Sequence, residues 1–118
     1  MRFFMLKAAQ IAAWFLAAVV TVLSLVPPWL RPETGAPHDV EHFAIYFATG
    51  LAFGFGYCRR PLVVTIALAA FAGMIEIAQI FVPGRHARLN DFIVDALALC
   101  AGAVLATIFA ARKLERTV

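Results

Sequence analysis

Four long apolar runs, separated by short polar connectors, occupy most of this 118-residue chain. They cover residues 8–26, 40–57, 62–82 and 91–111. A helix needs about 20 apolar residues to cross about 30 Å of hydrocarbon. The sequence therefore predicts an all-α integral membrane protein with four transmembrane helices, which form a single domain over residues 1–118. The second run is the shortest, and we expect it to begin in the membrane interface.

The composition excludes a water-soluble domain of this size. Hydrophobic residues make up 64% of the chain and charged residues 14%, against about 45–50% and about 25% in soluble domains. A small soluble domain has too little interior to bury so much apolar surface. The net charge is +3, but the basic residues lie between the apolar runs and form no polar face with aromatic residues. No nucleic-acid partner is therefore expected.

The lysines and arginines of the connectors and termini indicate how the chain is oriented. Seven fall on the side of the termini and three on the other side: Arg2, Lys7, Arg59, Arg60, Arg112, Lys113 and Arg116 against Arg31, Arg85 and Arg88. The positive-inside rule then predicts that both termini are cytoplasmic. The first apolar run is longer than the core of a typical signal peptide and is followed by prolines, so we expect a retained anchor.

Three pairs of polar residues occur in the last three runs, each with helical spacing. The pairs are His42 and Tyr46, Glu76 and Gln79, and Asp91 and Asp95. Spacings of three and four residues place the members of a pair on one helical face, and antiparallel threading brings all three pairs to the outer side. From the helical rise we expect Glu76 about 10 Å and Asp95 about 7 Å inside the ends of their runs. Ionisable side chains inside a membrane are costly and point to function, so the pairs predict a shared polar pocket.

The residues of this pocket and of the connector above it form two candidate groups. The catalytic candidates are Glu76, Asp95 and His42, and the substrate-binding candidates are Arg85, Arg88, His86, Tyr46, Gln79 and Asp91. Guanidinium groups bind phosphate in a bidentate manner, and histidine transfers protons near neutral pH. No activated nucleophile is evident, because Ser24 and Thr49 have no clear base beside them. Whether the protein is an enzyme stays open.

A purely structural interpretation of the same residues is also open. The helix dipole favours acidic residues at a helix N-terminus, which suits Asp91 and Asp95, and Arg85 and Arg88 would neutralise them. Glu76 fits this interpretation least. It lies in the C-terminal half of an apolar run, where the dipole disfavours an acid.

The sequence contains one motif whose residue spacing matches a known metal site. His38, Glu41 and His42 match the H-x-x-E-H pattern of some zinc proteases. Pro37 precedes His38, which places this histidine at or before the start of the helix and spoils the geometry of two imidazoles on one helical turn. We therefore expect neither a metal nor another cofactor.

Two patterns of small residues predict close contact between helices. Gly50 and Gly54 are four residues apart in the second run, and Ala98 and Gly102 are four apart in the fourth. Small residues at this spacing let two helix backbones approach each other. We expect this packing within the chain, in preference to packing between two chains.

Four motifs follow one another in order along residues 22–102: Pro27-Pro28, His42-x-x-x-Tyr46, Glu76-x-x-Gln79, and PGRHARLNDFIVD from Pro83 to Asp95. Together they resemble the VanZ-like family of membrane proteins. The resemblance implies a multi-pass domain in the bacterial cytoplasmic (inner) membrane, linked to the cell envelope and to antibiotic resistance, since the founding member lowers susceptibility to teicoplanin. The family usually has asparagine at the position of Asp95 and glycine at that of Ala98, so this pocket is more acidic.

Three functions from different classes fit these features. The first is a protein that binds or modifies a membrane lipid or a lipid-linked envelope precursor at the outer leaflet. The second is a small proton-coupled transporter that works as a homo-oligomer, for which an acid near the middle of the membrane is required. The third is a non-catalytic membrane scaffold, in which the polar residues only lock the helices together.

Overall fold

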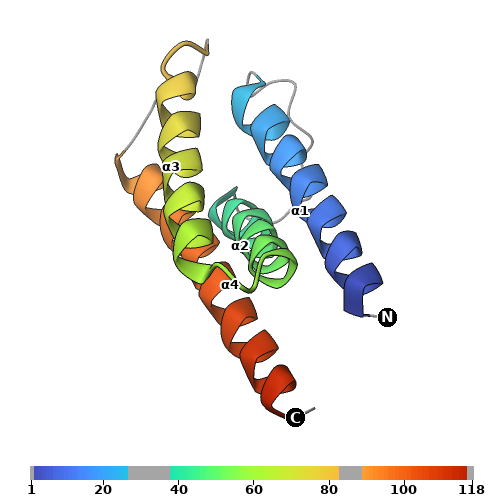
Figure 1. Cartoon of the computed structure of the whole chain (residues 1–118). Coiled ribbons are helices and arrows are strands. Elements are labelled where there is room, and N and C mark those ends of the chain that lie inside the picture. Colours follow the sequence, from blue (N-terminus) through green and yellow to red (C-terminus); the bar gives the residue numbers. More distant parts are fainter. Residues whose placement is uncertain (1, 27–37, 83–88, 117–118) are drawn as a thin grey trace.

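The computed structural model describes residues 2–26, 38–82 and 89–116, and these residues form four α-helices. Helix α1 spans Arg2–Leu25, α2 spans His38–Gly56, α3 spans Pro61–Gln79 and α4 spans Leu89–Arg116 (Figure 1). The prediction of an all-α chain with a helix in each apolar run is confirmed. Proline is favoured in the first turn of a helix, where its missing N–H is not needed, and Pro61 opens α3 in this way.

The helices depart from the apolar runs at their ends. Helix α1 begins at Arg2 instead of residue 8, and α4 continues to Arg116 instead of residue 111. Arginine and lysine are good helix formers, so hydropathy marks the apolar part of each helix and not its full length. Helix α3 ends at Gln79 instead of residue 82, because the backbone hydrogen bonds after it change to the tighter three-residue spacing.

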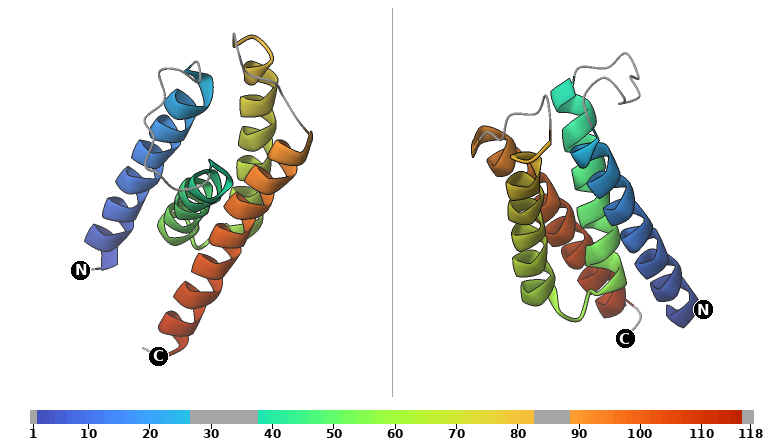
Figure 2. Two further views of the ribbon diagram at one scale, coloured as in Figure 1. Left: turned by 180° about the vertical axis from the view of Figure 1, so that it is seen from behind. Right: turned by 90° about the horizontal axis from the view of Figure 1, so that it is seen from above.

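Successive helices run antiparallel, up and down along the bundle (Figures 1 and 2). One end of the molecule, which we call the terminal end, therefore contains the start of α1, the turn between α2 and α3, and the end of α4 (Figure 2, right). The end of α1, the start of α2, the end of α3 and the start of α4 meet at the opposite end, which we call the polar end. This arrangement brings the polar pairs of the sequence to one end of the bundle.

Helix α2 is the centre of the packing. It packs most extensively against α4 and next against α1, while α3 packs mainly against α4. Figure 2 (right) shows α2 lying between α1 and α4. Contact between α1 and α3 is slight by comparison. The spatial order is therefore α1, α2, α4 and α3, which differs from the order along the chain.

The seam between α2 and α4 consists of backbone-to-backbone contact at glycines. A Cβ atom on Gly50 would collide with the carbonyl oxygen of Leu99, and one on Gly54 would lie 2.6 Å from that of Ala103. From the other helix, a Cβ on Gly102 would lie 2.8 Å from the backbone nitrogen of Leu51. Any side chain larger than hydrogen would force the helices apart. The prediction of close packing within the chain at these small residues is confirmed.

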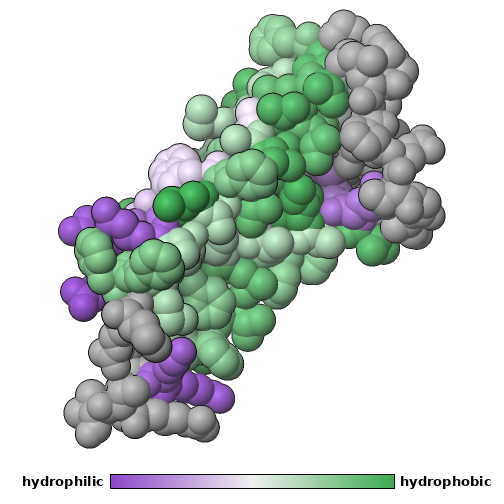
Figure 3. All heavy atoms as spheres, turned by 90° about the vertical axis from the view of Figure 1, so that its right-hand side faces the viewer, coloured by the Kyte–Doolittle hydropathy of each residue, from purple (hydrophilic) through white to green (hydrophobic). Residues whose placement is uncertain are grey.

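The surface of the bundle is apolar over its middle. Many large hydrophobic side chains are exposed there, such as Ile11, Phe15, Ile66, Met74 and Leu97. Figure 3 shows hydrophobic side chains across the middle of one face and hydrophilic ones toward its ends. A lipid environment accepts such a surface and water does not. The chain is a multi-pass membrane protein.

Three helices have segments that are long and apolar enough to cross a membrane, namely Phe3–Leu25, Pro61–Gln79 and Phe92–Lys113. Among the described residues, α2 contains no such segment, so the expected fourth span is not shown. Its first turns contain Asp39, Glu41 and His42, and these polar residues lower the hydropathy of a helix of 19 residues. Because α2 packs between two of the other helices, the side chains of His42 and Tyr46 lie against protein.

Candidate functional site

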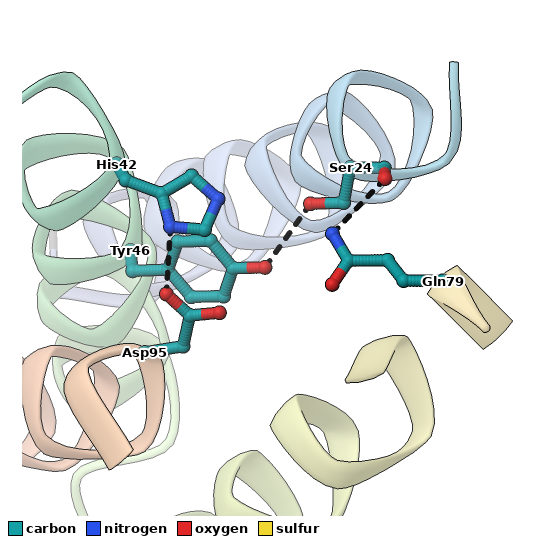
Figure 4. Close-up of polar contacts among 5 residues, drawn as sticks. All are labelled: Ser24, His42, Tyr46, Gln79 and Asp95. Carbon is teal, nitrogen blue, oxygen red and sulfur yellow. Dashed lines mark hydrogen bonds and ion pairs between the residues drawn. The ribbon is translucent and has the colours of Figure 1, made fainter. Parts of the chain in front are cut away.

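The candidate site lies at the polar end, where side chains from all four helices point toward one another (Figure 4). It comprises Ser24 of α1, His42 and Tyr46 of α2, Gln79 of α3 and Asp95 of α4. Ser24 and Gln79 lie in the last turn of their helices, and His42 lies in the second turn of α2. Because the helices alternate in direction, these distant positions in the sequence share one end of the bundle.

His42 and Asp95 form the central contact of the site. The Nδ1 atom of His42 lies 2.8 Å from Oδ1 of Asp95, and the aspartate side chain is only 1% exposed while that of the histidine is 12% exposed. A carboxylate this close to Nδ1 favours the neutral imidazole form that carries its proton on Nδ1. The other ring nitrogen, Nε2, then carries the lone pair. The pair thus has the geometry of a histidine oriented by an acid, as in many proton-transfer sites.

Tyr46 connects this pair to α1. Its ring lies against that of His42, with 4.9 Å between the ring centroids, and its hydroxyl forms a 3.1 Å hydrogen bond with Oγ of Ser24. Both side chains are buried, at 1% and 3% exposure. A buried hydroxyl without a partner destabilises a protein, so this bond satisfies two polar groups at once and links α1 to α2.

Gln79 connects α3 to α1. Its Nε2 atom donates a 3.1 Å hydrogen bond to the backbone carbonyl oxygen of Ser24. Carbonyl groups in the last turn of a helix have no partner within the helix, so the glutamine side chain serves the C-terminal end of α1. Gln79 itself is buried. The last turn of α1 is therefore bonded through Ser24 to both α2 and α3.

The structure brings together four of the residues singled out from the sequence: His42, Tyr46, Gln79 and Asp95. Glu76 lies one turn before Gln79 on α3, and both of its carboxylate oxygens are buried. From the helical rise, Glu76 lies about 4.5 Å from the end of α3 and Asp95 about 9 Å from the start of α4. These depths differ from those expected, because α3 ends earlier and α4 begins earlier than the apolar runs.

The remaining candidates lie outside the residues whose side chains the structure describes. Arg85, His86 and Arg88 belong to the connector between α3 and α4, and Asp91 lies in the first turn of α4. Their predicted part in substrate binding stays a prediction. The side chain of His38, the first residue of α2, also lies outside the described ones. Among the described residues, no cluster of three or more metal-binding side chains occurs.

Ser24 is the site residue that the sequence did not identify. The sequence offered it only as a nucleophile without a base, whereas in the structure its hydroxyl bonds to Tyr46 and its backbone carbonyl accepts from Gln79. Its position near the end of the first apolar run, at the same depth as the polar pairs, was the available signal. Thr49 is different: its buried hydroxyl donates to the carbonyl of Ile45 in its own helix, at 2.7 Å.

The family model for VanZ/LLP1 matches residues 9–110 of the chain. The protein belongs to the VanZ/LLP1 family. This confirms the resemblance drawn from the motifs, and the matched region contains all five residues of the site in Figure 4. No curated protein and no solved structure matches the chain. The VanZ/LLP1 match therefore identifies the family of this membrane protein, while its activity has to be argued from the site.

Proposed function

We propose that this VanZ/LLP1 protein binds the anionic headgroup of a cell-envelope amphiphile at the polar end, on the outer side of a bacterial cytoplasmic membrane. The ligand class is a membrane lipid or a lipid-linked envelope precursor. The observation that supports the proposal is the 2.8 Å contact between His42 and Asp95, because the side chain of Asp95 is only 1% exposed. Ionisable side chains are rare in membrane helices and mark sites of function by default.

The exposure of the pair supports a binding role over a purely structural one. The aspartate is fully buried, whereas part of the histidine is accessible. A pair that served only to lock α2 to α4 would gain nothing from an accessible imidazole, and the glycine seam already holds these helices together. In this proposal the ligand contacts the pair through His42, whose side chain is 12% exposed, and not through Asp95, which is 1% exposed.

The connector between α3 and α4 supplies the positive charge that an anionic headgroup requires. Arg85, His86 and Arg88 lie between two helices whose ends flank the site. Guanidinium groups bind phosphate through paired, charge-assisted hydrogen bonds. In this proposal the arginines hold the headgroup, and His42, oriented by Asp95, accepts a proton or a hydrogen bond from it through Nε2.

The outer location rests on the distribution of basic residues and on four membrane spans, with α2 as the fourth. Seven of the ten lysines and arginines belong to the side of the terminal end. Alkaline phosphatase fused at Arg85 should be active, and the same enzyme fused after Arg60 should be inactive. The reverse pattern of activities would place the polar end in the cytoplasm and end this part of the proposal.

Ligand binding is tested with the purified protein in phosphatidylcholine nanodiscs and a fluorescent polyprenyl phosphate as probe. Arg85→Gln with Arg88→Gln should weaken binding about 100-fold, and His42→Gln about 10-fold, on the basis of about 1.4 kcal/mol for each lost charged contact. Asp95→Asn keeps the shape and removes the charge, so it separates proton transfer from hydrogen bonding. Thr49→Val, a buried polar change outside the site, is the matched control.

Folded variants that bind the probe as well as the unchanged protein does would overturn the proposal. The link to teicoplanin is tested separately, by the susceptibility of cells that express the protein. The His42→Gln variant should remove any protection that the unchanged protein gives, and Thr49→Val should keep it.

The scaffold function is a second candidate, because a specific observation favours it. The bonds of Ser24 to Tyr46 and Gln79 connect three helices without requiring a ligand. A double change of His42 and Asp95 to leucine separates the two functions. A scaffold should keep its stability and its cellular phenotype with this apolar pair, whereas a binding site should lose the phenotype.

A further inference from the structure

The terminal end contains a cleft that is separate from the site at the polar end. It is half open and lies between the start of α1 and the turn after α2. Its volume is about 470 Å³, and its lining includes Phe3, Leu6, Gln10, Tyr57, Arg59 and Arg60. One wall comes from α1 and is apolar at Phe3 and Leu6, while the other comes from the turn and is polar and cationic.

The polar wall is held in place by hydrogen bonds from α1. Gln10 donates through Nε2 to the carbonyl oxygen of Gly56 at 2.9 Å, and Trp14 donates through Nε1 to the hydroxyl oxygen of Tyr57 at 2.9 Å. The backbone N–H of Arg60 donates to the carbonyl of Tyr57 at 3.0 Å, which closes the turn. The backbone that carries the two arginines is thus fixed relative to α1, as a binding site requires.

The charge of the cleft points to an anionic ligand. Arg59 and Arg60 are exposed, and none of the described residues of the lining is an aspartate or a glutamate. Lys7 lies beside the cleft, with its Nζ atom 5.1 Å from the centre of the Phe3 ring. Because the Tyr57 oxygen accepts its hydrogen bond from Trp14, its own O–H is directed elsewhere and can donate to a ligand. Two guanidinium groups and a phenol match the oxygens of a phosphate.

We propose that this cleft binds the phosphate of an anionic phospholipid. Phe3 and Leu6 would contact the glycerol and the first acyl carbons, and Arg59, Arg60 and Tyr57 would contact the phosphate. The apolar wall favours a lipid over a free phosphate ester, because a soluble ester offers nothing to cover it. This site is separate from the proposed function at the polar end, and either can fail without the other.

The test measures how lipid headgroups bind the full chain, by native mass spectrometry of the protein released from nanodiscs. The nanodiscs contain phosphatidylcholine with or without phosphatidylglycerol, and glycerol phosphate is the soluble competitor. Arg59→Gln with Arg60→Gln should reduce retained phosphatidylglycerol about 10-fold or more, since two charge-assisted contacts are lost. Both side chains are exposed, so the variant should fold.

Two further variants separate a cleft from general surface charge. Arg112→Gln with Lys113→Gln removes the same charge from the same end of the molecule, outside the lining, and should change retention by less than about 2-fold. Leu6→Trp keeps both arginines and fills the cleft, and should reduce retention as much as the loss of the arginines does.

Equal losses in the two charge variants, or unchanged retention with Leu6→Trp, would show that only surface charge attracts the lipid and would overturn the proposal. Displacement of the lipid by millimolar glycerol phosphate would show that the cleft takes a free phosphate ester in preference to a lipid. Retention of phosphatidylcholine equal to that of phosphatidylglycerol would also contradict it.

Discussion

The two ends of the bundle handle polar side chains in opposite ways. At the polar end, Asp95, Tyr46 and Ser24 are nearly inaccessible; Tyr46 and Ser24 share a hydrogen bond, and Asp95 contacts His42 of another helix. At the terminal end, Arg59 and Arg60 are exposed, and the hydrogen bond between Trp14 and Tyr57 lies at the surface. A buried polar group depends on its partner, whereas an exposed one is also served by water. The same kinds of substitution should therefore have large effects at one end and small effects at the other.

The largest effect is expected at Gly50, because the glycine seam holds together α2 and α4, the two helices that pack most extensively. Gly50→Val should lower the free energy of unfolding by about 3 kcal/mol or more, since its Cβ collides with a backbone carbonyl that cannot turn aside. Thermal unfolding in detergent measures this. Gly73→Ala is the matched control: its Cβ would meet a ring carbon of Phe92 at an ordinary 3.5 Å, and alanine favours the helix by about 1 kcal/mol.

The next largest effect is expected at the contact between His42 and the buried Asp95. His42→Ala leaves the Asp95 carboxylate, 1% exposed, without its imidazole, and should destabilise the protein by about 3 kcal/mol. Adding Asp95→Leu to His42→Ala should restore much of this loss, because it removes the buried charge as well. A double variant no more stable than the single one would show that the two side chains do not act as a pair.

A smaller effect is expected where a neutral hydrogen bond is removed at the polar end. Gln79→Leu leaves the carbonyl of Ser24 without its side-chain donor and should cost about 1 kcal/mol. Hydrogen exchange at the end of α1 should become faster in this variant, because its last turn loses a support. If α1 exchanged at its original rate, the bond would contribute nothing to holding that turn.

The smallest effect is expected at the exposed end. Trp14→Phe keeps an aromatic ring near Phe53, where the two rings now meet edge to face, and removes only the exposed hydrogen bond to Tyr57. The free energy of unfolding should change by less than about 0.5 kcal/mol. A loss as large as that of Gln79→Leu would show that the two ends do not differ as described.

The features that the sequence predicted correctly follow from local patterns. Long apolar runs predicted the four helices, and the spacing of Gly50, Gly54 and Gly102 predicted the close seam. Helical spacing and antiparallel threading predicted that His42, Tyr46, Gln79 and Asp95 would share one end of the bundle, and the contact of His42 with Asp95 agrees with this. Each of these depends on periodicity or on the direction of the chain.

The features that were missed depend on tertiary packing. The spatial order of the helices, with α2 against α4, cannot be read from chain order, so the partners of Ser24 were not foreseen. The bond of Gln79 goes to a backbone carbonyl, a group that no motif displays. Hydropathy also misjudged the helix ends, because arginine and lysine continue a helix beyond its apolar part.

The glycine seam has a mechanical consequence for how a lipid-like ligand reaches His42. With α2 and α4 in backbone contact, these two helices form one rigid block that carries both His42 and Asp95. Helix α1 touches α3 only slightly, and the described bond between them at the polar end is that of Gln79 to Ser24. We expect a ligand to enter from the bilayer by separation of α1 from α3, which would break the hydrogen bond of Gln79 to Ser24.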